Sequence, residues 1–294
     1  MQTGELLTAI ITPFNKDKNI DLDAFERVIE HVIAQGSDGI IVAGTTGESP
    51  TLSSEEKKTL FSTAIEVVNK RVRIIAGAGT NDTKTSVLES ISATNIGVDG
   101  IMAVTPYYNR PTQLGMYKHF QAIATCTNLP IMVYDIPSRA SVALDVETIV
   151  QLSQIKNIRS LKDASGNIEA TTEVIEETDP YFNVYSGDDA MTLPLLSIGA
   201  TGVVSVASHV IGKQMKQMMD TFLAGDVHQA AQIHAKLSPL MNGLFKTTSP
   251  ILIKEMLAQL GVATSNTRLP LVQANDAEID LIDSLITDYN LSYA

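Results

Sequence analysis

The sequence predicts a (β/α)8 barrel of the TIM type, followed by a helical extension at the C-terminus. Three segments, at 36–41, 97–102 and 199–204, end a helix-like apolar pattern on one glycine and place a second glycine three residues later, before a run of apolar residues. The first glycine suits the left-handed position that ends a helix, and the apolar run is typical of a parallel strand covered on both faces.

The second observation is the regular spacing of eight strand-like segments. They lie at 6–12, 39–44, 73–78, 100–105, 130–135, 158–163, 182–186 and 202–207. Their starts are roughly 20 to 34 residues apart, which is the length of one strand-helix unit. Eight such units favour a closed barrel over a doubly wound open sheet.

Helical patterns fill the gaps between these segments. Before the helix expected after the second strand, Ser53 and Glu56 form a capping-box pattern, and Asp23 with Glu26 predicts the same start for the first helix. Further helical patterns at 227–237, 251–260 and 277–289 carry no strand signal. We therefore expect a catalytic barrel domain at 1–223 and a C-terminal helical extension at 224–294.

The composition predicts a folded protein that binds neither nucleic acid nor a membrane surface. Of 294 residues, 44% are hydrophobic and 18% are charged, which is typical of a globular chain. The net charge of −12 opposes binding to nucleic acid or to an anionic membrane.

The single cysteine and the N-terminal segment predict a cytoplasmic protein. Because Cys126 is the only cysteine, the chain cannot form an intrachain disulfide, which fits a reducing compartment. Cys126 lies in an apolar-periodic stretch, where we expect a buried structural thiol. Residues 1–14 lack a basic segment, and their apolar run is too short for a signal peptide or a membrane span.

Unusual polar residues follow several strands, at the edge where barrel enzymes carry their chemistry. Residues 44–49 read GTTGES, in which two glycines around two hydroxyls can form an anion cradle or an ordinary turn. Tyr107 and Tyr108 follow the fourth strand, and paired tyrosines are more often packing or interface residues than catalysts. The GAG at 77–79 lacks the third glycine of a dinucleotide loop, so we discount that interpretation.

The fifth and sixth strands end in a phenol, an arginine and a lysine. Arg139, five residues after Tyr134, suits bidentate binding of a carboxylate, although a surface position is the alternative. Strand alternation places Lys162 on the opposite face from Asp163. Lys162 is then either an amine inside the barrel or a salt-bridged structural lysine.

A buried, neutral lysine would perform Schiff-base chemistry. The amine attacks a carbonyl only when deprotonated, and a pKa near 7 corresponds to roughly 4.6 kcal/mol relative to the usual value. Desolvation can supply this shift, and neutral hydroxyls such as Tyr134 and Thr45 can relay protons. The five histidines are scattered and show no metal-ligand spacing, so we expect neither a metal nor a cofactor.

Together these motifs resemble the dihydrodipicolinate synthase family of pyruvate-dependent class I aldolases. The matching segments lie at 44–49, 107–111, 134–139, 161–166 and 186–189, in the family's order along essentially the whole chain. The resemblance implies a 4-hydroxy-tetrahydrodipicolinate synthase activity of the lysine and diaminopimelate pathway. In this reaction a lyase joins pyruvate, bound to Lys162 as a Schiff base and enamine, to aspartate 4-semialdehyde.

The resemblance also implies the roles of three hydroxyls and the assembly. Tyr134, Thr45 and Tyr108 would form the proton relay, with Tyr108 supplied by a neighbouring subunit. The family is typically a homotetramer built as a dimer of dimers, which this shared site would explain.

Four further residues would bind the substrates by the same resemblance. Thr46 would hold the carboxylate of pyruvate, and Arg139 would hold that of the semialdehyde. Gly187 and Val204 would line the pocket near the imine.

The chain departs from the family pattern at functional positions. Asp135 replaces the usual asparagine after the strand-five tyrosine. Thr85 replaces the glutamate with which lysine-inhibited members meet the inhibitor's ammonium. We therefore predict weak or absent feedback by lysine, although three residues of that site remain: Ser49, Asn81 and Tyr107.

Two alternatives stay open from the residues. N-acetylneuraminate lyase or a keto-deoxy-sugar aldolase would share Lys162, Tyr134 and the glycine-hydroxyl loop, but such enzymes tend to lack the tyrosine pair and Arg139. A non-catalytic barrel that binds small acids is the alternative from another class. The complete set of lysine, tyrosines, threonine and arginine favours the synthase.

Overall fold

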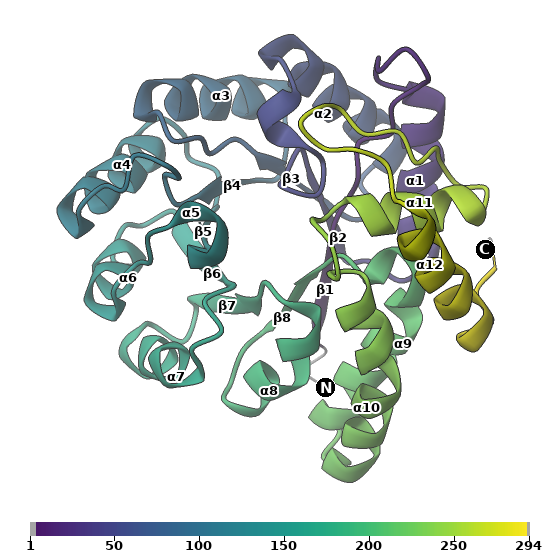
Figure 1. Cartoon of the computed structure of the whole chain (residues 1–294). Coiled ribbons are helices and arrows are strands. Elements are labelled where there is room, and N and C mark those ends of the chain that lie inside the picture. The colour runs from purple at the N-terminus through teal and green to yellow at the C-terminus, as the bar shows by residue number, and fades with distance from the viewer. Residues whose placement is uncertain (1–3, 293–294) are drawn as a thin grey trace. The chain divides into compact units, whose positions relative to one another are not determined.

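The computed structural model describes residues 4–292, and these residues contain eight strands (Figure 1). They are β1 (Glu5–Ala9), β2 (Gly39–Val42), β3 (Arg73–Gly77), β4 (Gly100–Val104), β5 (Ile131–Asp135), β6 (Ile158–Asp163), β7 (Asn183–Ser186) and β8 (Gly202–Ser205). Their hydrogen-bonded order follows the chain in a closed barrel. The predicted (β/α)8 fold is confirmed, and every predicted strand segment overlaps one observed strand.

Helices alternate with the strands and then continue to the C-terminus. They are α1 (Leu22–Ala34), α2 (Ser54–Val68), α3 (Thr83–Ile96), α4 (Gln113–Thr125), α5 (Pro137–Ala140), α6 (Val146–Ser153), α7 (Ile168–Glu177), α8 (Thr192–Ser197), α9 (Ser208–Leu223), α10 (Val227–Gly243), α11 (Ile251–Gln259) and α12 (Asp276–Asp288), with short 3-10 helices η1 (Ser49–Thr51) and η2 (Asp189–Met191). Between residues 224 and 292 the structure contains α10, α11 and α12 and no strand. The helical extension is therefore confirmed, while the domain boundary at 223 stays a prediction.

Residues 73–204 form one compact unit. Its strands β3 to β8 pair in parallel, and the register places Tyr134 of β5 beside Lys162 of β6. Helices α3, α4, α6 and α7 pack in succession along the outside of these strands (Figure 1). All five residues of β5 are buried, as expected for a strand of a parallel sheet.

The other compact unit combines residues up to 72 with those from 205 onward. Strands β1 and β2 pair in parallel, with Thr8 beside Ile40. Helix α1 packs against α2 and α9, α9 against α10, and α11 against α12. Phe14, Phe25 and Phe61 are fully buried in this unit. The C-terminal helices therefore belong to the same packed unit as the first two strand-helix repeats.

The repeated glycines end their helices as predicted. Gly36, Gly97 and Gly199 have φ of 94°, 102° and 105°, the left-handed region in which a side chain is strained. The N–H of Gly97 bonds to the carbonyl of Ala93 and so closes the last turn of α3.

The two predicted helix starts had different outcomes. Ser53 and Glu56 form the expected reciprocal capping box at α2. The start predicted at Asp23 is wrong, because α1 begins two residues earlier and its N-cap Asp21 accepts the N–H of Ala24. Asp23 instead lies in the first turn, where its charge still complements the helix dipole.

Gly79 has a packing role that agrees with our rejection of a dinucleotide loop. A Cβ at this position would lie 2.5 Å from the nitrogen of Val104 and 2.7 Å from the Cα of Ala103. Only glycine lets the segment after β3 approach β4 this closely.

Within residues 4–292, no helix is both long enough and apolar enough to cross a membrane.

Candidate active site

Lys162 lies in the buried interior of the 73–204 unit. Lys162 is 5% exposed, and Tyr134 on the neighbouring strand is 3% exposed. The Nζ atom of Lys162 lies 4.0 Å from the centroid of the Tyr134 ring. The cross-strand register that aligns the two residues is what brings the amine onto the phenol.

Burial lowers the pKa of Lys162 to about 7. The carboxylate of Asp189 opposes this shift, and the guanidinium of Arg139 adds to it. The aromatic ring also favours the ammonium form, so desolvation outweighs the attractive contacts. The amine is therefore available as a nucleophile near neutral pH.

Asp163 points away from the amine, as strand alternation predicts. Its carboxylate accepts hydrogen bonds from the hydroxyl of Thr171 on α7 and from the N–H of Ser165 at 2.8 Å. Because these bonds hold the charge toward the helix, it does not pair with Lys162.

Gly187 lies at the end of β7 against the end of β6. Its N–H donates to the carbonyl of Asp163 at 2.6 Å, and a Cβ would lie 2.8 Å from that of Ala164. Val204 is buried in β8. The close approach at Gly187 requires a residue without a side chain.

Arg139 lies in the short helix α5 and is exposed. The segment from Asp135 to Leu144, which carries Arg139, is closed by a hydrogen bond between its two ends. The carboxylate of Asp135 accepts the N–H of Leu144 at 3.3 Å. Burial raises the pKa of Asp135 to about 7, with a further contribution from the charge of Asp163. Asp135 is thus a buried carboxyl that is half protonated near neutral pH.

Tyr108 is 88% exposed and projects from a strained loop. Its φ is 73° and that of Arg110 is 47°, both in the left-handed region. Asn109 fastens the loop through a 2.8 Å hydrogen bond from its amide to the carbonyl of Asn81. Tyr107 is half-buried beside it.

The glycine-hydroxyl loop belongs to the other compact unit. Thr45 is half-buried and Thr46 is 4% exposed. The N–H groups of Gly47 and Glu48 donate to the carbonyls of Gly44 and Thr45 at 3.1 and 3.0 Å, which makes a tight turn. Ser49 begins η1 directly after it.

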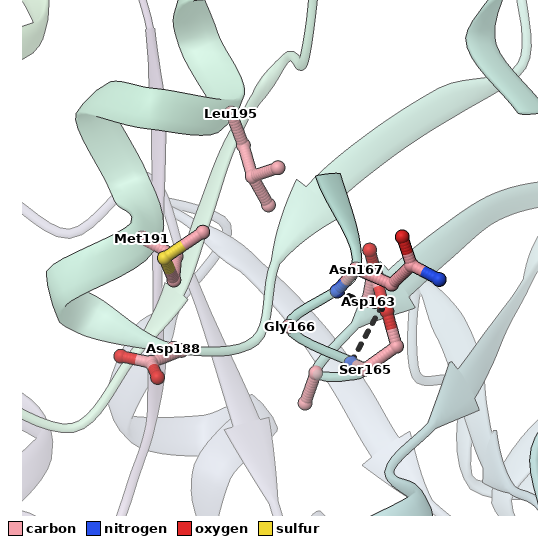
Figure 2. A pocket seen from close by; sticks show the side chains of 8 residues that line it. Asp163, Ser165, Gly166, Asn167, Asp188, Met191 and Leu195 are labelled. Atoms are coloured by element: carbon pink, nitrogen blue, oxygen red, sulfur yellow. Dashed lines mark hydrogen bonds between the residues drawn. The ribbon is translucent and has the colours of Figure 1, made fainter. Parts of the chain in front are cut away.

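A cavity of about 210 Å³ lies outside the end of β6 (Figure 2). The loop from Asp163 to Asn167 forms one wall, and Asp188, Met191 and Leu195 form the other. Lys162 and Tyr134 do not line it, so this cavity is separate from the amine.

Cys126 caps the end of α4 and is half-buried. Its thiol donates to the carbonyl of Ile123 at 3.1 Å, and burial raises its pKa. These features are those of a structural thiol and not of a nucleophile.

Across residues 4–292, no group of three histidine, cysteine or acidic side chains is arranged to hold a metal ion.

Comparisons with known proteins show the family of this chain. The model of the dihydrodipicolinate synthetase family matches residues 2–288. The chain is 53% identical to 4-hydroxy-tetrahydrodipicolinate synthase 2 of Halalkalibacterium halodurans, covering 99% of this chain and all of that one. The chain belongs to the dihydrodipicolinate synthetase family.

Solved members of the dihydrodipicolinate synthetase family share the whole fold. A dihydrodipicolinate synthase from Bacillus anthracis superimposes with a TM-score of 0.95 at 44% identity, over 98% of both chains. A monomeric variant of dihydrodipicolinate synthase superimposes with a TM-score of 0.95 at 37% identity, over 99% of this chain and 98% of that one.

Three residues that matter in this family member were not identified from the sequence. Asp189 is buried, and its carboxylate raises the pKa of Lys162. The only signal for it in the sequence is its place in the motif at 186–189. Glu48 and Lys254 form a buried ion pair. Lys254 stands in an ordinary helical pattern, so no local signal marked it.

Proposed function

We propose that this chain condenses pyruvate with aspartate 4-semialdehyde, the reaction of a 4-hydroxy-tetrahydrodipicolinate synthase. The observation that carries the proposal is the buried amine of Lys162 on the ring of Tyr134, in a chain that matches this family over residues 2–288. A pKa near 7 leaves the amine both nucleophilic and able to take a proton back.

The steps follow from the chemistry of a neutral amine. The Nζ of Lys162 attacks the C2 carbonyl carbon of pyruvate, and the carbinolamine loses water to give an iminium ion. Loss of a C3 proton gives the enamine, whose C3 forms a bond to the aldehyde carbon of the semialdehyde. The aldehyde oxygen takes up a proton to become a hydroxyl, and the enamine nitrogen becomes part of an imine again. The amino group of the added chain then attacks the imine carbon, closes the ring and releases Lys162.

Hydroxyl groups carry the protons in this scheme. Tyr134 acts on the carbinolamine, and Thr45 connects it to Tyr108 in a relay that holds no charge against the amine. The 88% exposure of Tyr108 supports its donation to the site of a second copy of the chain.

Two cationic or polar groups orient the substrates. Thr46 holds the carboxylate of pyruvate, and Arg139 binds that of the semialdehyde in bidentate fashion. Gly187 and Val204 line the pocket near the imine, where small or apolar groups keep water from the iminium carbon.

We also infer a homotetramer built as a dimer of dimers, in the cytoplasm. Sedimentation equilibrium of the purified chain is expected to give a mass of four chains. A fully active monomer would contradict both this assembly and the shared role of Tyr108.

Borohydride reduction in the presence of pyruvate tests the reaction. Mass spectrometry is expected to find the reduced adduct on Lys162, and the Lys162→Arg variant is expected to form none while remaining folded. Turnover with aspartate 4-semialdehyde, and no cleavage of sialic or keto-deoxy acids, separates the synthase from its sister aldolases. An adduct on another lysine, or no adduct, would overturn the proposal.

A further inference from the structure

A buried ion pair joins the glycine-hydroxyl loop to the C-terminal helices of the same compact unit. Lys254 on α11 is 0% exposed, Glu48 is 3% exposed, and the Nζ atom contacts the Glu48 carboxylate. The same Nζ donates to the carbonyl of Asn266 at 2.8 Å and lies 4.3 Å from the centroid of the Phe14 ring. A carboxylate, a carbonyl and an aromatic face therefore enclose the ammonium.

Glu48 is held at both its carboxylate and its backbone. One carboxylate oxygen contacts Lys254, and the other accepts the backbone N–H of Arg268 at 2.9 Å. The N–H of Glu48 donates to the carbonyl of Thr45, and its own carbonyl accepts the hydroxyl of Thr51, both at 3.0 Å. Residues of the C-terminal segment therefore bind the side chain of Glu48, while the backbone of Glu48 forms part of the glycine-hydroxyl loop.

The loop has little freedom to move without strain. Glu48 has φ of 56°, a left-handed conformation that is strained for a residue with a Cβ. At Gly47 a Cβ would lie 3.2 Å from both the Cα of Ala43 and the hydroxyl of Thr12. Thr45 and Thr46 immediately precede these two residues, so any relaxation at Glu48 moves them.

Arg268 makes a second tie from the same C-terminal segment. Its guanidinium donates to the carboxylate of Glu56 at 2.5 and 3.0 Å and to the carbonyl of Thr51 at 2.8 Å. It therefore fixes the far end of the loop and the first turn of α2.

Stability alone does not account for the Glu48–Lys254 pair. Removing two charges from water carries a large desolvation penalty, and well-packed apolar residues of similar volume are often equally stabilising. What an apolar pair cannot supply is the directional bonding that keeps Glu48 in its strained conformation.

We propose that Glu48 and Lys254 are positioning residues for pyruvate, because their ion pair holds Thr45 and Thr46 in the geometry that the keto acid requires. This inference rests on the proposed function, in which Thr46 binds the pyruvate carboxylate. The C-terminal helices thereby act on the chemistry through a loop that they pack against.

Three variants test the proposal by steady-state kinetics and by borohydride trapping at graded pyruvate concentrations. Glu48→Gln keeps the shape of the side chain, Lys254→Met keeps most of its length, and the double variant leaves no unpaired buried charge. In each we expect the KM for pyruvate to rise roughly tenfold, while the KM for the semialdehyde stays within about twofold.

Arg71→Met is the matched control. It removes an exposed ion pair with Glu30 in the same compact unit, 42% and 53% exposed at the two side chains, and should leave both KM values unchanged. A purely structural role of the buried pair would lower the active fraction and leave both KM values alone. The double variant matters most, because it is expected to fold even where Lys254→Met does not.

The outcomes separate this inference from the function on which it rests. An adduct on the unmodified chain, with an unchanged pyruvate KM in a folded double variant, overturns the positioning role alone. A parallel rise in both KM values also overturns it, because the loop would then have no selective effect on pyruvate. Absence of any adduct on the unmodified chain overturns both proposals.

Discussion

The amine of Lys162 lies over the phenol ring of Tyr134, with 4.0 Å between Nζ and the ring centroid. The two residues are register partners on β6 and β5, so the contact is built into the strand pairing and does not depend on a loop. Desolvation in this position lowers the pKa of the amine to about 7. The proposed nucleophile and the proposed proton donor are thus positioned by the pairing of two strands.

The pKa of Lys162 predicts how imine formation depends on pH. The amine attacks only when neutral, so the rate of borohydride-trapped adduct formation should rise with pH, pass its midpoint near 7 and level off above it. Tyr134→Phe keeps the ring under the amine but removes the hydroxyl. It should slow trapping by about 10²- to 10⁴-fold without a large change in the midpoint. A midpoint near 10 in the unmodified chain would contradict the desolvated amine.

Arg139 is expected to affect both the binding of the semialdehyde and the pKa of Lys162. Arg139→Met should raise the KM for the semialdehyde by about tenfold or more and leave that for pyruvate nearly unchanged, because a bidentate carboxylate contact is lost. The guanidinium lowers the pKa of Lys162, so its removal should also move the midpoint of adduct formation upward. Stopped-flow trapping between pH 6 and about 9 measures this shift. A downward shift would contradict the assigned electrostatics.

Asp135 should make stability fall as pH rises. Its pKa is raised to about 7 in the folded state, from the ordinary aspartate value of 3.8. Between these values the unfolded chain loses a proton that the folded chain keeps, so the free energy of unfolding decreases with rising pH and levels off above 7.

Asp135→Asn removes this titration and should be more stable than the parent above pH 7, by on the order of 2–4 kcal/mol. Urea denaturation at pH 5 and 8 measures the difference, which should be smaller at the lower pH. Asp145→Asn, at an exposed position of the same unit, is the control. Equal pH dependence of parent and Asp135→Asn would refute the raised pKa.

Feedback by lysine should be weak. The hydroxyl and the N–H of Thr85 both donate to the carboxylate of Asp82, at 2.6 and 2.7 Å, so this position offers no charge to an ammonium. Millimolar lysine should leave initial rates nearly unchanged, and strong inhibition below that range would contradict the prediction. Thr85→Glu should increase sensitivity while keeping α3 capped, because glutamate suits this third helical position. Thr85→Ala is its control.

The order and placement of the strands could be predicted because each strand-helix unit carries its own local signals. Gly97 ends α3 in the left-handed region, and the apolar run that follows begins at Gly100. Such signals depend on residues a few positions apart. The misplaced start of α1 shows their limit, since Asp21 and Asp23 are both good caps and only the backbone conformation separates them.

Part of the candidate site could also be predicted. Strand alternation predicts that Lys162 and Asp163 point to opposite faces of their strand. The structure has this arrangement, because Asp163 bonds to Thr171 of α7 and Lys162 lies over the ring of Tyr134. Asp189 and the Glu48–Lys254 pair were missed, because each depends on a contact between segments that are distant in the chain.

By itself, the sequence determined the eight-stranded fold, the family and the residue types that its chemistry requires. Tertiary structure decided the charge on those residues and the strain in their loops. A pKa depends on how completely other segments exclude water from a group, and a left-handed residue such as Glu48 persists only where distant partners hold it. Neither quantity is a property of neighbouring positions along the chain.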